Sequence, residues 1–357
     1  MKILINKTSS LGDIIHAFPV IAYLREKIPN STIDWTVEKP FASLVDAHPD
    51  VDRSILINTR VWRRNLFSLH VQEEMKSFYR DLKSSSYDVV FDLQGNTKSG
   101  VVTYLSQACH KVGFAKPVVP EILNIFATDR RFMPPKGKNI RDDYLYLVQS
   151  YFNDVVPFSF KGVKLNISTD ELNQVHDVIG SHPKRTGPKI MVCPGSAWIN
   201  KQMSEEFLQD FLQRIAHDQD PAFFFVWGTD DERYLVETLS SKMKESSLVL
   251  KKMPLPVLQR VMGEVDLVIA MDSLPLHLAG TTATPTYSIF GPSSAKKYCP
   301  VGNRHHAFQG YCPYGQSFEK RCDLLRSCQT GNCIKKVSGV TLFEHFTQCF
   351  PLLSHID

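Results

Sequence analysis

The chain has no long hydrophobic segment and almost no excess of charge of either sign. None of its apolar runs approaches the roughly 20 residues that cross a bilayer, and Asn6, Lys7 and Asp13 interrupt the first one before it could act as a secretory signal. The 41 basic and 37 acidic residues give a net charge of +4, which is too balanced for a general nucleic-acid-binding protein. We therefore expect a cytosolic protein without a nucleic-acid partner.

The common glycine-rich nucleotide motifs are also missing. No GxGxxG sequence lies near the first apolar run, which argues against an NAD-dependent dehydrogenase, and none of the turns described below is a Walker P-loop. The C-terminal cysteines include no CxxC pair, the usual spacing of a zinc site. A structural metal site on these thiols is the alternative to free thiols, which the sequence favours. They are Cys312, Cys322, Cys328 and Cys333.

Short apolar runs recur along the chain and alternate with segments of helical periodicity, which is typical of parallel α/β sheets. Several runs end in polar turns, and in open α/β sheets ligands bind at the carboxyl ends of the strands. With 357 residues the chain is longer than a single core usually supports, so we expect two domains. The runs cover residues 3–5, 33–37, 89–91, 190–193, 223–226, 267–269 and 286–289.

A stretch rich in proline and glycine separates these runs into two groups. It covers residues 161–187 and shows weak periodicity, apart from a polar helix candidate near residues 169–179. We predict an N-terminal domain over residues 1–160, this connection, and a second domain over residues 188–335. Residues 336–357 form a C-terminal segment with a helix candidate.

The turn after residues 190–193, PGSAWINK, has the composition of a phosphate site. Gly195 permits close backbone approach, the Ser196 hydroxyl can donate a hydrogen bond, and Lys201 supplies a point charge. The alternative is a solvated lysine on an ordinary strand-to-helix turn.

A second polar turn, DSLPLH, follows residues 267–269. Asp272 and Ser273 are suited to cap the next helix, and the same helix N-terminus is a natural anion site. His277 lies one helical turn further along and is either a buried core histidine or a ligand-binding group.

The first polar turn, KTSSLGD, places Asp13 between a glycine and a predicted helix. The simplest interpretation is a helix N-terminal carboxylate, stabilised by unpaired N–H groups and by the helix dipole. The other is a carboxylate that takes a proton from a bound hydroxyl at a strand end. The residues of this turn leave both interpretations open.

Taken together, these turns resemble those of the bacterial ADP-heptose:lipopolysaccharide heptosyltransferases. The similarity extends from KTSSLGD to the FGP turn near residue 290 and is strongest to the branch that adds the first heptose to the Kdo residues of the inner core. It implies the GT-B fold, in which two Rossmann-like domains with parallel sheets face each other across a cleft, with a C-terminal helix packed back on the N-terminal domain. It also implies a cytoplasmic glycosyltransferase of Gram-negative lipopolysaccharide biosynthesis, peripheral at the inner membrane.

The resemblance carries the donor, ADP-heptose, onto the second half of the chain. The adenine would lie near Met253, and the ribose would contact Asp230 or Asp231 in WGTDDER. Leu274 and Pro275 stand where family members usually have glycine. The resemblance implies no metal or other cofactor. The residues around the diphosphate would be Ser196, Ala197, Lys201, Asp272, Ser273, Leu274 and His277.

The acceptor, a Kdo residue on lipid A, would bind to the first half. Ser9 and Ser10 share the turn of Asp13, Lys98 in DLQGNTKSG matches a family lysine, and Lys7 is a further cation. A loop in NTRVWRRNLFS resembles the family's acceptor loop, and arginine binds carboxylates and phosphates through two hydrogen bonds. A solvated basic loop on an anionic membrane surface is a compatible alternative. The arginines are Arg60, Arg63 and Arg64.

The implied reaction is an inverting displacement with two catalytic residues. Asp13 would take the proton of the acceptor hydroxyl, and Lys201 would stabilise the departing ADP. A later core heptose or a protein hydroxyl is an alternative acceptor. A sugar-nucleotide-binding protein without turnover is the alternative from another class.

Overall fold

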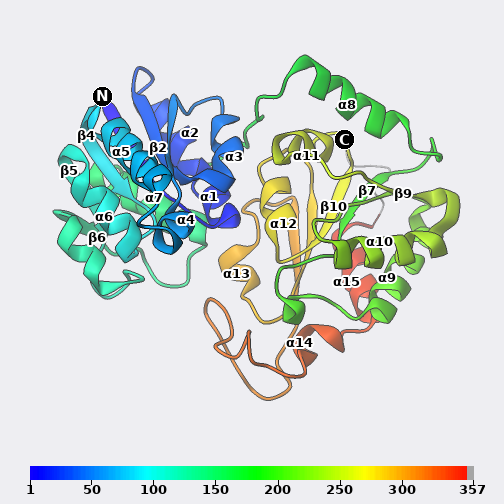
Figure 1. Ribbon diagram of the computed structural model, residues 1–357. Coiled ribbons are helices and arrows are strands. Elements are labelled where there is room, and N and C mark those ends of the chain that lie inside the picture. Colours follow the sequence, from blue (N-terminus) through cyan, green and yellow to red (C-terminus); the bar gives the residue numbers. More distant parts are fainter. Residues whose placement is uncertain (352–357) are drawn as a thin grey trace. The chain divides into compact units, whose positions relative to one another are not determined.

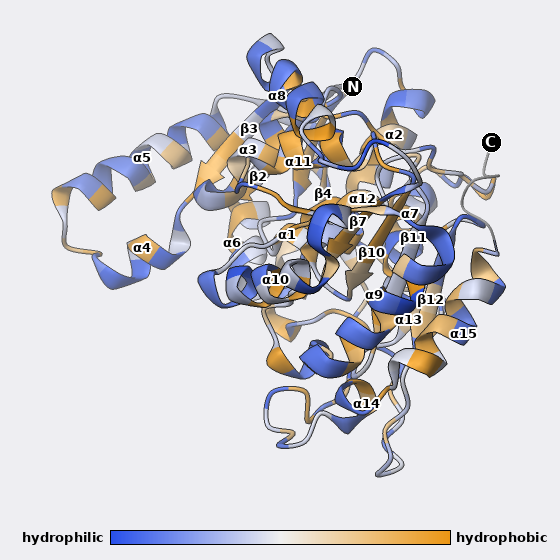
Figure 2. Cartoon of the chain, turned by 90° about the vertical axis from the view of Figure 1, so that its right-hand side faces the viewer, coloured by the Kyte–Doolittle hydropathy of each residue, from blue (hydrophilic) through white to orange (hydrophobic). Residues whose placement is uncertain are grey.

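The computed structural model describes residues 1–351, and the chain divides after Asn166 into two compact units. Each unit is a parallel six-stranded sheet with helices on both faces (Figure 1). In Figure 2 the strands β7 and β10 are largely orange and the outer faces of the helices are blue, so the apolar residues gather on the sheets. Among the described residues, none of the helices combines the length and the hydrophobicity that a membrane crossing requires.

The first sheet has the order β3-β2-β1-β4-β5-β6. Its central strand is continuously apolar because both of its faces are covered: Ile3, Leu4 and Ile5 have no exposed surface. The strands are β1 (Lys2–Asn6), β2 (Thr32–Glu38), β3 (Arg53–Ile57), β4 (Ser86–Asp92), β5 (Gln107–Phe114) and β6 (Arg130–Phe132). The helices are α1 (Leu11–His16), α2 (Phe18–Lys27), α3 (Ala42–Asp46), α4 (Thr59–Arg64), α5 (Leu69–Lys83), α6 (Thr97–Leu105) and α7 (Ile140–Tyr151), with short 3-10 turns η1 (Lys39–Phe41) and η2 (Ile122–Ala127).

The second sheet repeats this layout, with the order β12-β11-β10-β7-β8-β9. Its strands are β7 (Lys189–Cys193), β8 (Ala222–Phe225), β9 (Ser247–Val249), β10 (Leu267–Met271), β11 (Thr286–Phe290) and β12 (His305–Gln309). Its helices are α8 (Thr169–Gly180), α9 (Glu205–Gln219), α10 (Asp230–Met243), α11 (Leu255–Met262), α12 (Leu274–Ala279), α13 (Ala295–Tyr298), α14 (Asn332–Lys335) and α15 (Gly339–Cys349), with η3 (Ile199–Lys201) and η4 (Lys244–Ser246). The predicted fold class, a two-domain α/β protein with parallel sheets, is confirmed.

The segment that links the two sheets includes a helix of the second unit. Ser168 caps α8, and its hydroxyl accepts the N–H of Glu171 at 3.2 Å while the Glu171 carboxylate accepts the Ser168 N–H at 2.8 Å. The helix packs on α11. The helix candidate predicted near residues 169–179 is therefore confirmed, and it belongs to the second unit.

The C-terminal helix differs from the expectation that residues 336–357 pack on the N-terminal domain. α15 lies on α9 and β12 of the second unit, and its Leu342 and Phe346 have no exposed surface. Its apolar face completes the second core, which explains its position. Residues 352–357 of that segment lie outside the described part of the chain.

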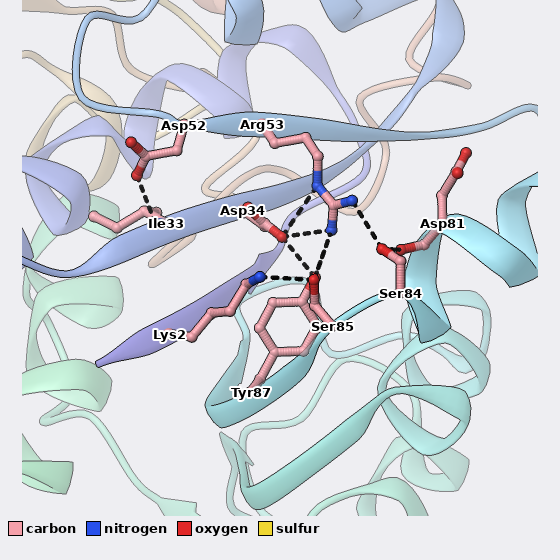
Figure 3. A network of polar contacts seen from close by, with 9 residues as sticks. All are labelled: Lys2, Ile33, Asp34, Asp52, Arg53, Asp81, Ser84, Ser85 and Tyr87. Atoms are coloured by element: carbon pink, nitrogen blue, oxygen red, sulfur yellow. Dashed lines mark hydrogen bonds and ion pairs between the residues drawn. The ribbon is translucent and has the colours of Figure 1, made fainter.

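A polar cluster closes the amino edge of the first sheet (Figure 3). The buried Asp34 accepts hydrogen bonds from Arg53 Nη2 at 2.6 Å and from the Tyr87 hydroxyl at 2.7 Å. Beside it, Lys2 Nζ donates to Ser85 Oγ at 2.7 Å. These residues lie at or near the first residues of β1, β2, β3 and β4. The cluster therefore holds these strands in register at the amino edge.

Candidate active site

The predicted site residues lie at the topological switch points of the two sheets. In each sheet the strand order reverses beside the central strand, between β1 and β4 in the first and between β7 and β10 in the second. Asp13 follows β1, Lys98 follows β4, Ser196 and Lys201 follow β7, and Asp272 follows β10. Open α/β sheets bind ligands at such points. Each unit therefore brings its own candidate residues to one edge of its sheet.

Asp13 is a half-buried residue in the first turn of α1. Its Oδ2 accepts the Ser10 N–H at 3.1 Å and the Ser10 hydroxyl at 2.8 Å. The N–H of Ser9 donates to Gln94 Oε1 at 3.2 Å, which ties this turn to the end of β4. Asp13 is thus a helix N-terminal carboxylate, as the simplest interpretation predicts, and it is also held at a strand end in a fixed orientation.

Lys7 lies beneath this turn and is almost completely buried. Its Nζ donates to the Leu93 carbonyl at 3.1 Å and to the Tyr144 hydroxyl at 2.8 Å. Burial lowers the pKa of Lys7, and the carboxylates of Asp13 and Asp92 oppose this shift. Lys7 is therefore an internal cation below the turn, and the expectation that it contacts the acceptor is wrong because its amine faces the protein interior.

Asp92 organises the neighbouring turn after β4. This fully buried carboxylate accepts the N–H groups of Gln94 at 3.0 Å and Gly95 at 2.9 Å, and the Asn124 amide at 2.7 Å. Burial raises the pKa of Asp92, and the hydrogen bonds from Gly95 and Asn124 oppose the shift. Asp92 thereby fixes Gln94, which in turn holds the turn of Asp13.

The predicted basic residues differ in whether the protein itself supplies a carboxylate partner. Arg60, Arg63 and Arg64 are exposed on α4. Lys98 Nζ instead donates to the buried Glu38 at 2.8 Å, and Glu38 also accepts the Thr59 N–H at 3.1 Å at the start of α4. The three arginines are thus open to an anionic ligand, whereas Lys98 links α6 to the beginning of α4.

In the second unit, Asp272 and Lys201 form a buried ion pair. Lys201 Nζ lies 2.5 Å from Asp272 Oδ2, the Ser293 hydroxyl donates to the same oxygen, and His277 Nε2 lies 3.6 Å from Oδ1. Burial alone would raise the pKa of Asp272, but Lys201, His277 and Ser293 together lower it. The carboxylate is therefore ionised at neutral pH and holds the lysine at the end of β10.

The structure shows His277 as a buried histidine, and ligand binding by its ring stays a prediction. It lies on α12 and is only 7% exposed, and its ring also faces Asp272. It is a buried histidine beside a carboxylate.

The remaining candidates for diphosphate binding are close in sequence to Lys201 or Asp272. Ser196 is buried, and its carbonyl accepts the Gln202 amide at 2.6 Å, whereas Ala197 is exposed. Ser273 caps α12 with an extended backbone, and Leu274 and Pro275 form the first turn of that helix, where proline is tolerated because no helical hydrogen bond needs its N–H.

Glu232, which the sequence did not single out, lies against Gly195 in the Ser196 turn. Its Oε2 accepts the N–H groups of Gly228 at 2.7 Å and Thr229 at 3.2 Å. A Cβ on Gly195 would lie 2.2 Å from its carboxyl carbon, so a side chain at position 195 would displace the Glu232 carboxylate. Asp230 and Asp231, the predicted acids, are exposed in the first turn of α10. The T-x-x-E capping pattern of Thr229 and Glu232 was the available signal.

Met253, the predicted adenine neighbour, is half-buried just before α11. Close to it in the chain, Trp227 donates its Nε1–H to the Leu250 carbonyl at 2.8 Å. The Lys252 amine lies 6.0 Å from the Trp227 ring centre and donates to the Gly228 carbonyl at 2.9 Å. These contacts fix the chain around Met253.

The cysteine-bearing segment supports the turn of Lys201. Asn200 Nδ2 donates to the carbonyls of Leu325 at 3.0 Å and Cys328 at 2.8 Å. The Arg326 guanidinium lies 4.5 Å from the Trp198 ring centre, a cation–π contact. Residues 198–201 are thus held from outside the sheet.

The thiols of this segment are free, and a structural metal site on Cys312, Cys322, Cys328 and Cys333 is not supported. In residues 1–351, no three His, Cys, Asp or Glu side chains are arranged to hold a metal ion. Burial, with the neighbouring thiols, raises the pKa of Cys333 to about 11. The segment is packed by backbone and side-chain contacts.

Two parallel six-stranded sheets, each with polar turns at its switch point, are the architecture of the GT-B fold. The model of glycosyltransferase family 9 (heptosyltransferase) matches residues 75–327, and the chain belongs to this family. It is therefore a glycosyltransferase.

Named relatives and solved structures agree with this assignment. The chain is 28% identical over 294 residues to lipopolysaccharide heptosyltransferase 1 of Pseudomonas aeruginosa, covering 82% of this chain and 79% of the relative. It is 27% identical to the Escherichia coli K12 protein of the same name, covering 82% and 88%. In fold it is similar to E. coli heptosyltransferase WaaC with ADP, with TM-score 0.79, 22% identity and coverage of 98% and 100%. The structure of E. coli ADP-heptose lps heptosyltransferase II gives TM-score 0.71, 16% identity and coverage of 98% of both chains.

Proposed function

We propose that the protein transfers heptose from ADP-heptose to a Kdo residue of the lipopolysaccharide inner core, with inversion at the anomeric carbon. The named relatives, all below 30% identity, support the class of reaction. The observation that carries the proposal is the pair of polar turns: one holds a half-buried carboxylate and the other a lysine on a buried aspartate.

In the proposed reaction the acceptor oxygen forms a bond to the anomeric carbon as the bond from that carbon to the diphosphate breaks. Asp13 takes the proton of the acceptor hydroxyl. The hydrogen bonds from Ser10 to Asp13 Oδ2 orient the carboxylate for this step, and Ser9 lies in the same turn. ADP leaves with the negative charge that the broken bond gives it.

The donor would be bound by the second unit. Lys201 supplies a positive charge to the leaving diphosphate, so no metal or other cofactor enters the proposal. Met253 would contact the adenine. We propose Glu232 as the acid for the ribose hydroxyls in place of the exposed Asp230 and Asp231, because it lies against Gly195. The other diphosphate residues would be Ser196, Ala197, Asp272, Ser273, Leu274 and His277.

The acceptor would be bound by the first unit through Arg60, Arg63 and Arg64, with Lys98 behind them. Kdo and lipid A carry carboxylates and phosphates, which suit the exposed guanidinium groups. An acceptor of this kind also places the enzyme at the cytoplasmic face of the inner membrane. A different acceptor, or donor binding without turnover, would give other outcomes in the assay below.

The test measures ADP release from ADP-heptose with and without Kdo-lipid A. We expect release that depends on the acceptor and falls by roughly 10²-fold to 10⁴-fold in Asp13→Asn. Glu171→Gln is the matched control, since Glu171 accepts the N–H and the hydroxyl of Ser168 at 2.8 and 3.0 Å, as Asp13 does from Ser10. Equal activity of Asp13→Asn and wild type would reject Asp13 as the base, and donor binding without release would reject the Kdo acceptor.

A further inference from the structure

Helices α4 and α5 form a projection of the first unit, and its tip is apolar. In Figure 2 the two helices extend away from the sheet and the connection between them is orange. Every residue from Arg63 to His70 is exposed. The exposed fractions are 51% for Leu66, 95% for Phe67 and 78% for Leu69. Three large apolar side chains therefore point into solvent within four positions.

The tip is held in this conformation by contacts at its base. Trp62, five residues before Phe67, is buried, packs on Phe78 at 5.5 Å between ring centres, and donates its Nε1–H to Glu74 at 2.7 Å. The backbone turns tightly, with the Ser68 N–H donating to the Asn65 carbonyl at 2.9 Å. Trp62 anchors the base of the projection, and Phe67 is exposed at its tip. The contacts at the base therefore hold Phe67 in its exposed position.

The charges on the α4 side of the tip are all positive, and the exposed Glu73 lies one helical turn beyond Leu69 on α5. Arg60, Arg63 and Arg64 are exposed, and the sequence has no acidic residue from position 53 to position 72. The nearest partly buried acid, Glu74, already accepts hydrogen bonds from Trp62 and Lys39. Apolar side chains flanked by arginines are the pattern of a segment that lies in the interface of an anionic bilayer.

We propose that residues 60–70 dock this protein on an anionic lipid bilayer. Leu66, Phe67 and Leu69 enter the boundary between headgroups and acyl chains, and the arginines contact lipid phosphates. The charge pattern selects this occupant, because three exposed arginines against one exposed acid, Glu73, give the projection an excess of positive charge that matches an anionic surface. With only three inserted side chains, the binding is reversible and depends on salt.

The inference rests on the proposed function in one respect: docking would bring the enzyme to a membrane-bound acceptor. Docking is measured without donor or acceptor, so the two can fail separately. Heptose transfer without vesicle binding would reject docking alone, and vesicle binding without heptose transfer would reject the proposed function alone.

The first experiment is co-sedimentation of the full chain with vesicles of phosphatidylglycerol and phosphatidylethanolamine, and with phosphatidylcholine vesicles. We expect binding to the anionic vesicles that weakens with salt, and a loss of about tenfold or more in Leu66→Ser/Phe67→Ser. Tyr311→Ser is the control, since Tyr311 is 84% exposed in the second unit. Unchanged binding of the double variant, an equal loss in the control, or no binding of the wild type would each overturn the proposal.

A second variant reports insertion directly and does not depend on a loss of binding. Phe67→Trp places an indole at the exposed tip, where acyl-chain-brominated lipid should quench its fluorescence on anionic vesicles. The wild type, whose Trp62 is buried at the base, gives the background to subtract. Absence of quenching in vesicle-bound Phe67→Trp would show that the tip does not insert.

Discussion

Two buried aspartates, Asp34 and Asp272, are alike in chemistry and differ in their place in the fold. Each is at most 4% exposed. Asp34 pairs with Arg53, and Asp272 pairs with Lys201 and lies beside His277. The partners of Asp34 are among the first residues of two strands, at the amino edge of the first sheet. The partners of Asp272 lie in turns and a helix at the carboxyl edge of the second sheet. Burial and charge pairing alone do not separate a structural cluster from a site. Position relative to the strand direction does.

The largest difference should appear when each cation is removed. We expect Lys201→Met to lower kcat/KM for ADP-heptose by roughly 10²-fold to 10³-fold, because one charge at a leaving group has this order of effect. Arg53→Met is the matched change at the other cluster, and its kcat/KM per folded molecule should equal that of the wild type. Steady-state ADP release on both variants checks this, and a similar loss in both would remove the distinction between the clusters.

Removal of Asp34, at the amino edge, should lower the stability of the protein and leave its activity unchanged. Asp34→Ala leaves Arg53 and the Tyr87 hydroxyl without their shared acceptor, and loss of one partner of a buried pair costs about 3–5 kcal/mol. Because the Arg53 side chain is 38% exposed, we expect a value near the lower end, about 3 kcal/mol. Urea unfolding measures it, with activity of the remaining folded protein unchanged.

A buried histidine without an acid beside it sharpens the comparison with His277. His48 is 1% exposed and accepts the Asp50 N–H at 3.2 Å. Burial, with the charge of Arg25, lowers the pKa of His48 to about 4. The unfolded chain binds the proton first as the pH falls, so stability decreases below about pH 6.5, by about 2 kcal/mol between pH 7 and pH 5.

Urea unfolding at the two pH values checks this, with His48→Asn as the reference that cannot titrate in this range. If both proteins lose the same stability, His48 is not the group responsible.

The smallest effect concerns the support of the Lys201 turn. Asn200→Ala removes two hydrogen bonds to the carbonyls of Leu325 and Cys328, each worth about 1 kcal/mol. We expect the KM for ADP-heptose to rise several-fold with a smaller change in kcat, because the turn loosens while Lys201 itself remains. Asn332→Ala, which removes a contact with the exposed Tyr314 hydroxyl in the same segment, should leave both constants unchanged.

The sequence predicted the interior of both sheets better than their edges. The apolar runs matched β1, β2, β4, β7, β8, β10 and β11, which are continuous because both of their faces are covered. The strands that it missed are β3, β5, β6, β9 and β12, and of these β3, β6, β9 and β12 are the edge strands. All five residues of β12 are half-buried, and β5 includes His110 and Lys111. Polar residues at such positions hide the strand pattern.

The sequence predicted the turns of the candidate site but not the contacts between their side chains. Lys201 and Asp272 were both candidates, but their pairing across 71 positions of sequence comes from the neighbouring places of β7 and β10 in the sheet. Lys7 is as polar in sequence as Lys98, and only its place beneath Leu93 and Tyr144 shows that it is internal. Glu232 was missed because its proposed role rests on its closeness to Gly195, which the sequence does not show.

The link between Asn200 and the carbonyls of Leu325 and Cys328 also bears on the order in which the protein becomes competent during its synthesis. The last strand of the second sheet ends at Gln309, so every strand exists in the nascent chain before those carbonyls have been made. The turn of Lys201 gains its outer support only after residues 325–328 have been synthesised. A truncated product that ends soon after β12 would contain both sheets and still lack the support of the Lys201 turn by the carbonyls of Leu325 and Cys328. The formation of the strands and the fixing of this turn are therefore separate events.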